Sequence, residues 1–454
     1  MRLSILALLL LAAPAWAQSS VFVVNQGNFS DGNGSVTALP GGLDGDPAEL
    51  FEGQLGSILQ SATLLGNSLY LLSNTAGRID IVDATTLERT GQITGPFSSP
   101  RYLADANSGV YVSNQVYDGT PSFILPVDLG SGTTGDPIFV EGQPEGLVPV
   151  GGLGFDNKRM YVALGSGGPD FGGADSLAVL SLNRAELIGY VDIDCYARSV
   201  AQGPGGGVVA FCSDTDEAVL VDPQTDTVTD RVAFGEDIGD PFDVGQAFAY
   251  SLEALARRPI PAGPLYVITA SGFAVLDAGP TGLEITRRVV IPDADTRPIS
   301  AIGVEQGRND RVVLGRPDPD APFSATGTAT VHDATTGALL MTIQAGIYPA
   351  DIVTLESSFL VANETALEAG VTVRLAGANP TRGRIALEVV LEQQSVVRIS
   401  VLDVTGRVVR DLEVAVAAGM GRVDLDLDGV SPGTYLARVV LEGETASIPL
   451  TVVR

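Results

Sequence analysis

Three arginines, one glutamate and one glutamine stand at similar points of successive stretches of the chain, each just before or within an apolar run. An arginine guanidinium is a planar fork of donors that can bind a carboxylate or sugar hydroxyls with defined geometry. If the fold brings these residues together, they form a binding site for an anionic or sugar-like ligand. The alternative, which we favour from the sequence alone, is that they join neighbouring structural units by salt bridges and satisfy strand ends. The five residues are Gln60, Arg101, Glu145, Arg198 and Arg297.

The arginines and the glutamate could also serve a lactonase- or lyase-like enzyme, but other catalytic classes lack the residues they need. The single histidine, His332, lies in the apolar run "ATVHDATTG" and is expected to pack in a strand rather than act as a general base. Copper, haem and Ser-His-Asp sites all need well-placed histidines, and no glycine loop is followed by Lys-Ser/Thr to cradle phosphate. We therefore expect no cofactor and no metal, and we favour a non-enzymatic role.

Two cysteines, Cys195 and Cys212, flank a "GPGG" turn that begins at Gly203. If the hairpin tip lies at residues 203 and 204, the two cysteines face each other across two antiparallel strands. A disulfide suits an exported protein, and two buried thiols are the alternative.

The segment "DLDLDG" resembles the start of a calcium loop, with carboxylates at Asp424, Asp426 and Asp428. The twelfth position of such a loop is Tyr435 instead of glutamate, and leucines alternate with the aspartates. This pattern predicts an edge-exposed strand rather than a calcium site.

The composition limits the partners of the chain. It holds 54 acidic and 26 basic side chains and has a formal net charge of -28. Nucleic acids and anionic membranes both require basic surfaces, so we expect neither as a partner. The 54 glycines and 27 prolines indicate many turns and an all-β protein.

Residues 1–17 have the pattern of a secretory signal peptide. A basic Arg2 is followed by an apolar stretch over residues 5–13 and the small-x-small site Ala15-Trp16-Ala17. No later stretch is apolar for long enough to span a bilayer, so we expect no transmembrane segment in the mature chain. An exported chain beginning near Gln18 is predicted.

A repeat supplies the elements that must position the polar residues. Similar apolar runs, such as Tyr70-Leu-Leu-Ser and Tyr111-Val-Ser-Asn, begin at residues 22, 70, 111, 161, 209, 266 and 313. Spacing of roughly 40–50 residues with several short strands in each unit is typical of a β-propeller, in which one blade needs its neighbours for stability. The inner strands would then line a central funnel where the five polar residues could meet.

The blade count rests on candidates for the third strand of each blade. There are seven of them, and "PADIVTLE" is expected to complete the first blade from the other end of the chain, which closes the ring and removes open sheet edges. We predict a seven-bladed β-propeller over residues 18–368. Eight blades is the alternative, because an apolar run recurs at Leu360-Val-Ala-Asn. The third-strand candidates are Ser35–Leu39, Arg78–Val82, Ser122–Val127, Ser176–Leu180, Ala218–Val221, Phe273–Leu276 and Thr328–His332.

An aspartate ends this strand in several units, followed by a polar turn as in "DATT". We expect each carboxylate to accept backbone N–H groups of the turn, rather than to ligate a metal. The aspartates are Asp83, Asp222, Asp277 and Asp333.

The segments "VFVVNQGNF", "LGSILQSATLLGNSLYLLSN" and "SSPRYLADANSGVYVSNQ" resemble the YVTN-repeat surface-layer propellers of bacteria. The likeness is closest to a Bacteroidetes-type exported subgroup and covers roughly residues 20 to 365. It implies a propeller fold and no particular activity. Later units such as "VVAFCSD" lack the Tyr and Asn of the motif.

From Val371 onward, apolar and polar residues alternate, which predicts about seven strands in a small Ig-like antiparallel β-sandwich over residues 369–454. The preceding "ETALEAG" is expected to be a linker. The motifs "LDVTGRVVRDL", "GVSPGTYLARV" and the final "LTVVR" resemble the C-terminal sorting domain of the type IX secretion system. That resemblance implies the type IX machinery as a partner, and export through the periplasm to the medium or the outer surface.

Taken with the propeller, these features predict an exported or cell-surface binding module. Its ligand is expected to be an extracellular glycan, a protein or a small anionic molecule.

Overall fold

A computed structural model describes residues 20–452, with gaps. The predicted signal peptide and the run at Leu360 lie outside the described residues. The gaps are 41, 45, 57, 66, 107–108, 151–158, 166–171, 204–205, 241–246, 251–263, 280–281, 295, 306–310, 356–363, 368–370, 377–383, 392–393, 404–406, 417–418, 428, 432 and 442–443.

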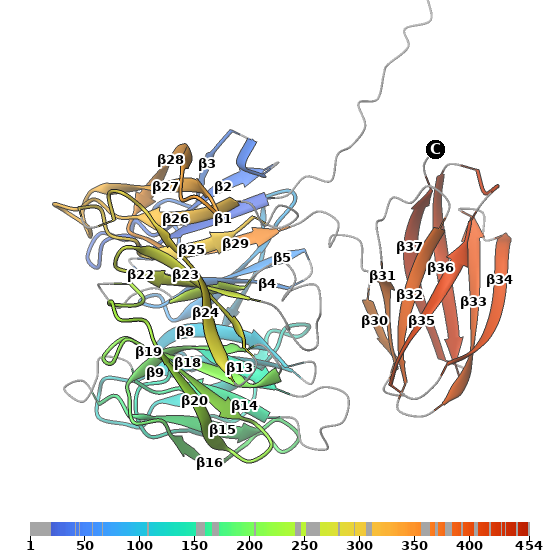
Figure 1. The fold of residues 1–454 in the computed structure, drawn as a ribbon, viewed down its shortest axis with the longest axis horizontal. Coiled ribbons are helices and arrows are strands. Elements are labelled where there is room, and N and C mark those ends of the chain that lie inside the picture. The colour runs from blue at the N-terminus through green and yellow to red at the C-terminus, as the bar shows by residue number, and fades with distance from the viewer. Residues whose placement is uncertain are drawn as a thin grey trace, which may run out of the picture.

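The described residues between 20 and 355 form seven antiparallel sheets, arranged like propeller blades (Figure 1). A short 3₁₀ helix, η1 (Gly42–Asp44), lies beside the first sheet. From inner to outer strand, the first three sheets are β29 (Pro349–Leu355), β1 (Ser20–Asn25), β2 (Ser35–Pro40) and β3 (Ala48–Leu50); β4 (Leu59–Leu65), β5 (Ser68–Ser73), β6 (Arg78–Asp83) and β7 (Arg89–Thr94); and β8 (Ser99–Asp105), β9 (Val110–Gln115) and β10 (Phe123–Asp128), which pairs with β11 (Thr133–Thr134) and β12 (Ile138–Phe139).

The other four sheets follow in chain order. They are β13 (Leu147–Val150), β14 (Arg159–Ala163), β15 (Ser176–Ser181) and β16 (Glu186–Asp192); β17 (Ala197–Gln202), β18 (Val208–Cys212), β19 (Glu217–Asp222) and β20 (Thr227–Ala233); β21 (Phe248–Tyr250), β22 (Leu265–Thr269), β23 (Gly272–Ala278) and β24 (Leu283–Val290); and β25 (Ala301–Val304), β26 (Arg311–Arg316), β27 (Thr326–Asp333) and β28 (Leu339–Ile347).

The first sheet is completed from the far end of the propeller segment. Strand β1 pairs with β2 on one side and with β29 on the other, with Val23 opposite both Thr37 and Ile352. The predicted closure by "PADIVTLE" is therefore present. Each of the seven predicted third-strand segments also falls in the third strand of its sheet, namely β2, β6, β10, β15, β19, β23 and β27.

Each apolar strand faces two neighbouring blades, because successive side chains of a strand point to opposite faces. In β5, Leu69 and Leu71 pack in the same cluster as Phe22 of the first sheet. Tyr70 and Leu72 of the same strand pack in the cluster that contains Val112 of the third sheet. The apolar core therefore lies between the blades, which explains why a single repeat cannot bury its own surface.

Side-chain hydroxyls join the inner strands to one another. Ser61 Oγ of β4 donates to the Arg101 carbonyl of β8 at 2.6 Å. Thr354 Oγ1 of β29 donates in the same way to the Val304 carbonyl of β25 at 2.9 Å. These bonds satisfy inner-edge carbonyls that lack a strand partner.

The aspartates that end the third strands act as the turn interpretation predicts. Asp83 Oδ1 accepts the N–H groups of Thr85 and Thr86, at 2.9 and 2.7 Å. These bonds favour the carboxylate and hold the pKa of Asp83 below its usual value. The same bonds recur at Asp333, and Asp277 accepts the N–H of the next residue, Ala278.

The C-terminal part is a sandwich of two four-stranded antiparallel sheets around an apolar core (Figure 1). The seven predicted strands are present as β31 to β37, and an eighth, β30, was not predicted. Because β30 pairs with β31, the linker interpretation is wrong for Glu364–Leu367. The two sheets are β30 (Glu364–Leu367), β31 (Val371–Ala376), β32 (Arg384–Leu391) and β35 (Gly419–Asp426); and β34 (Val408–Val416), β33 (Ser395–Asp403), β36 (Gly433–Leu441) and β37 (Glu444–Val452).

Candidate functional site

Four of the five polar residues singled out in the sequence meet in one hydrogen-bonded network. Arg101 donates two hydrogen bonds to Glu145, from Nε to Oε2 at 2.9 Å and from one Nη to Oε1 at 2.7 Å. Its other Nη donates to Gln60 Oε1. Arg198 donates to Glu145 Oε1 at 3.1 Å from the other side. These four residues are called the funnel network below.

The network spans four successive sheets at one end of the propeller. Gln60, Arg101 and Arg198 lie near the start of the inner strands β4, β8 and β17, and Glu145 directly precedes β13. We call this end of the sheets, where each inner strand begins and the second strand turns into the third, the mouth. Gln60 and Glu145 are almost fully buried, while the side chains of both arginines keep 12 % exposure.

The buried charges of the network, which lie in arginine–glutamate pairs, shift the pKa values of neighbouring groups. Burial alone lowers the pKa of Arg101, but the charge of Glu145 and its hydrogen bonds outweigh burial and raise the pKa. Tyr102, the next residue of β8, has a raised pKa because it is buried and because Glu145 is close. Both effects keep Arg101 charged and Tyr102 protonated.

A half-buried carboxyl near the network was missed at the sequence level. Asp351 of β29 accepts hydrogen bonds from the N–H groups of Ala62 in β4, at 3.1 Å, and of Ile352, at 2.8 Å. Burial raises the pKa of Asp351 to about 6 even though these bonds oppose the shift. The signal was present in the closing segment "PADIVTLE", whose one inward aspartate interrupts an apolar strand.

A second contact at the mouth joins distant parts of the ring. The hydroxyl of Tyr348, directly before β29, donates to the buried carboxylate of Asp240 and lies 2.6 and 2.8 Å from its two oxygens. Tyr348 has a φ of 51°, a conformation that costs energy for a bulky residue, and its ring stacks on Phe323 with centroids 4.7 Å apart. Asp240 and Arg198 line the same small cavity, so this contact adjoins the funnel network.

Arg297 and His332 lie outside the network. Arg297 donates to Thr328 Oγ1 at 3.0 Å. His332 is buried in β27, with its Nδ1 2.9 Å from the Gly337 carbonyl, and burial lowers its pKa. A buried neutral histidine in a strand fits the packing role predicted for it.

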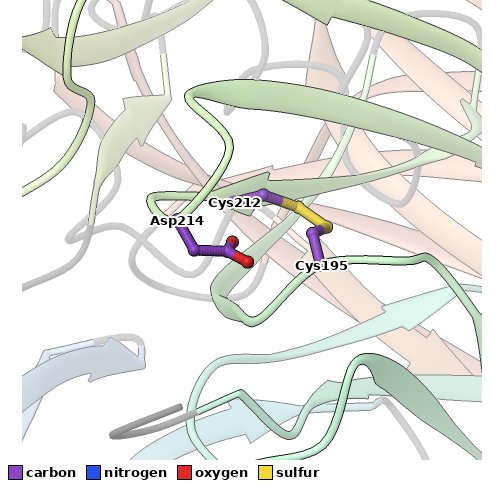
Figure 2. Close-up of side chains that lie close together, drawn as sticks. All are labelled: Cys195, Cys212 and Asp214. Carbon is purple, nitrogen blue, oxygen red and sulfur yellow. A yellow bond between two sulfur atoms is a disulfide. The ribbon is translucent and has the colours of Figure 1, made fainter. Parts of the chain in front are cut away.

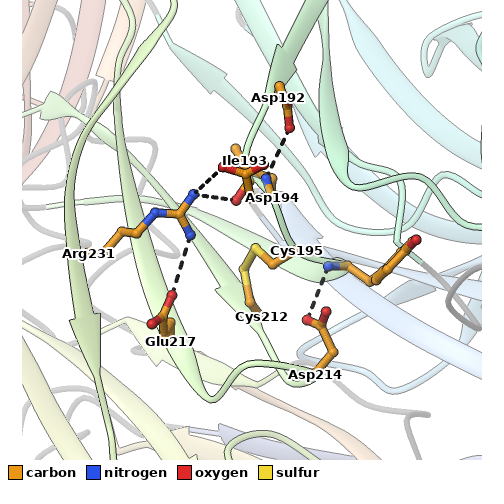
Figure 3. Close-up of a disulfide and its surroundings, with 9 residues drawn as sticks. Asp192, Ile193, Asp194, Cys195, Cys212, Asp214, Glu217 and Arg231 are labelled. Carbon is orange, nitrogen blue, oxygen red and sulfur yellow. Dashed lines mark hydrogen bonds and ion pairs between the residues drawn. A yellow bond between two sulfur atoms is a disulfide. The ribbon is translucent and has the colours of Figure 1, made fainter.

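Cys195 and Cys212 form a disulfide with their Cα atoms 5.8 Å apart (Figure 3). The predicted register of this hairpin is wrong. Val200 pairs with Ala210, and Ala197 pairs with Cys212 after a bulge, so Cys195 lies in the turn before β17. A longer tip, closed by the Gly203 N–H to the Gly207 carbonyl, moves the pairing away from the predicted position, and the bulge reduces that displacement by one residue.

Charged contacts surround this turn (Figure 3). Arg231 donates to the Ile193 carbonyl at 2.6 Å and pairs with Asp194 and Glu217, while Asp214 accepts the N–H of Tyr196 at 3.1 Å.

One group of potential metal ligands occurs among the described residues: Cys195, Cys212 and Asp214, whose ligand atoms lie within 4.8 Å of one another (Figure 2). Metal binding by cysteine requires thiolates, and both sulfur atoms are in the disulfide. The oxidised protein therefore has no metal site here.

The fold and the terminal sandwich define a class: a β-propeller joined to an export domain. The chain belongs to the family described as "Domain of unknown function (DUF5074)", whose model matches residues 19–257. The model of the secretion system C-terminal sorting domain matches residues 379–452, which indicates export by type IX secretion to the outer surface or the medium. No helix among the described residues has the length and apolar character of a membrane span.

One solved structure agrees with the architecture, and a second match is weaker. A functionally unknown protein from Desulfotomaculum acetoxidans DSM 771 matches with a TM-score of 0.53 and 9 % identity, over 75 % of this chain and 99 % of that one. At this identity the match supports a shared fold and says nothing about function. The hydrazine synthase of Kuenenia stuttgartiensis matches with a TM-score of 0.48 and 14 % identity, over 64 % of this chain and 88 % of that one. No curated protein matches the sequence.

Proposed function

We propose that this protein is an exported, non-enzymatic binding module of the YVTN-repeat surface-layer type, which takes an extracellular ligand at the mouth of its propeller. The observation that carries the proposal is the convergence of Gln60, Arg101, Glu145 and Arg198 from four successive sheets. A rigid ring of sheets and the buried Gln60 and Glu145 hold the two arginines, which keep exposed surface, in fixed positions, so a ligand that contacts the arginines loses little binding energy to their ordering.

The hydrogen bonds that Glu145 already makes favour binding over catalysis. Both of its carboxylate oxygens accept hydrogen bonds from guanidinium groups, and the side chain is 1 % exposed. A general base must reach a substrate proton directly or through one water. A carboxylate whose two oxygens are both bonded to arginines, and which is closed off from solvent, lacks the access for that step.

A lactonase- or lyase-like activity is the second candidate. The proximity of Arg101, Arg198 and Glu145 favours it, because an arginine pair can stabilise an anion that develops during ring opening or elimination.

Both candidates are tested by incubating the purified full-length protein with oligosaccharides, lactones and peptides, and measuring binding and product formation together. Saturable binding of an unchanged ligand supports the binding module. Reproducible turnover of a lactone or a uronate polymer contradicts it and favours the enzyme.

A further inference from the structure

An open pocket at the mouth lies beside the funnel network and belongs to none of the predicted sites. Its volume is about 510 Å³, which falls in the range typical of small-molecule sites. It is formed by the loop 116–122 between β9 and β10 and by the segment 140–143 that leads into β13. Gly142 has a φ of 87°, and a Cβ at this position would lie 3.0 Å from Ala174 Cβ, so the segment can pass this close only as glycine.

The aromatic ring of Tyr117 stands in this pocket as a fixed platform. The residue is 66 % exposed, yet its hydroxyl donates to Gln115, which is fully buried and donates in turn to the Pro144 carbonyl at 3.2 Å. Burial of the hydroxyl end raises the pKa of Tyr117, with the charge of Arg101 opposing the shift. An exposed ring with an anchored hydroxyl offers a flat apolar face at little entropic cost.

Polar groups line the pocket around that ring in set orientations. Ser122 Oγ accepts the Val116 N–H at 3.0 Å and donates to Gln143 Oε1 at 3.2 Å. The amide of Gln143 is therefore oriented, with its two Nε2 donors on the side away from Ser122. Glu141 is exposed at the rim of the pocket, and its backbone N–H donates to the Tyr190 hydroxyl at 3.0 Å.

We infer that this pocket, at Tyr117, Glu141 and Gln143, binds a pyranose unit of an uncharged or amino-bearing glycan. The apolar face of the sugar ring stacks on Tyr117, while its hydroxyls bond to Gln143 and Glu141. None of the described residues lining the pocket is basic, and the chain carries a net charge of -28, so uronic acids and sulfated sugars are disfavoured. The inference rests on the proposed binding function and names its ligand class.

The test is equilibrium binding of the full-length protein to hexasaccharides of glucose, mannose, N-acetylglucosamine and glucosamine, with alginate oligomers as the anionic set. At least one uncharged or amino-bearing hexasaccharide should bind saturably, and Tyr117→Ala should weaken that binding by about tenfold or more. Tyr117→Phe should keep most of it. Phe29→Ala is the matched control: it removes another exposed ring, from the loop between β1 and β2, and should leave affinity within about twofold.

The outcomes separate this inference from the proposed function. Glycan binding that survives Tyr117→Ala but is lost in Arg198→Gln overturns the pocket and leaves the funnel proposal standing. Binding to the anionic set alone also overturns the inference. If no sugar, peptide or lactone binds at all, both proposals fail. Thermal unfolding of each variant shows whether a loss of binding reflects a loss of fold.

Discussion

The funnel of the propeller and the core of the sandwich solve the same packing problem in opposite ways. In the sandwich, the described core cluster consists of apolar side chains from both sheets, and the ion pair between Arg398 and Asp411 lies on an exposed face. In the propeller, the inner strands meet around an axis, and a charged network of Arg101, Glu145 and Arg198 is buried there. In this protein, the charged groups that link separate sheets are the ones removed from water.

The geometry of each part gives the reason. Two sheets stacked face to face expose their charges at no cost, since each strand has a wet side. A ring of sheets has inner edges whose polar groups must be satisfied by a neighbour, as Ser61 and Thr354 show. Polar and charged side chains at the axis therefore hold the ring together and also give it a place to bind a ligand.

Removing the sandwich should have the largest effect, because it should abolish export and leave folding of the propeller intact. A chain ending before Glu364 should fold, because ring closure by β29 finishes at Leu355, but in the producing organism it should remain in the periplasm. Fractionation of cells and medium measures this, with the full-length chain as control. If the shortened chain still reached the medium, the sandwich would be better regarded as a binding module.

Breaking the funnel network should have the largest effect on stability. Glu145→Gln leaves Arg101 and Arg198 buried without their counter-charge, and we expect a loss of about 3–5 kcal/mol in the free energy of unfolding. Chemical denaturation measures the loss. The matched control is Glu186→Gln, which breaks the exposed pair with Arg184 and should cost at most about 0.5 kcal/mol. Equal effects of the two substitutions would mean that water screens the network.

Asp351 should give the propeller a pH dependence opposite in sign to that of Asp411 in the sandwich. Its pKa rises from 3.8 to about 6 on folding, so the stability linked to its protonation is full below about pH 3.8 and is lost as the pH rises through about 6. Between pH 4 and pH 7, the free energy of unfolding of Asp351→Asn should therefore increase by about 2 kcal/mol relative to that of the wild type.

Urea unfolding at several pH values measures this difference, and Asp411→Asn serves as the control of opposite sign. The pKa of Asp411 is lowered by its bonds to Arg398 and Ser400, so its contribution is lost as the pH falls. If the free energies of unfolding of the wild type and of Asp351→Asn changed in parallel with pH, Asp351 would be shown to be solvated.

The smallest effect is expected at the exposed pair of the sandwich. Arg398→Gln should leave the unfolding midpoint nearly unchanged, because solvent and salt screen a pair at the surface. Any small difference should vanish in 1 M salt. A large, salt-independent loss would contradict the contrast drawn between the two regions.

The features that depend on local chemistry could be predicted from the sequence. Alternating apolar residues located the third strand of every sheet, and the aspartate turns at Asp83 and Asp333 formed as predicted. The closing segment and the terminal sorting domain were also readable. These features follow from side-chain period and turn hydrogen bonds, which act between residues close in the chain.

Which distant groups meet depends on the three-dimensional fold. The partners of Arg101 stand 41 and 44 residues away in the sequence, and Tyr348 meets Asp240 across 108 residues. A shared position in successive repeats brought four candidates together, but the same reasoning also included Arg297, which bonds elsewhere. A longer hairpin tip shifted the register of the cysteine hairpin, and loop conformation alone created the pocket at Tyr117. Such outcomes depend on how twisted sheets stack and how loops close between them, and no local pattern encodes that geometry.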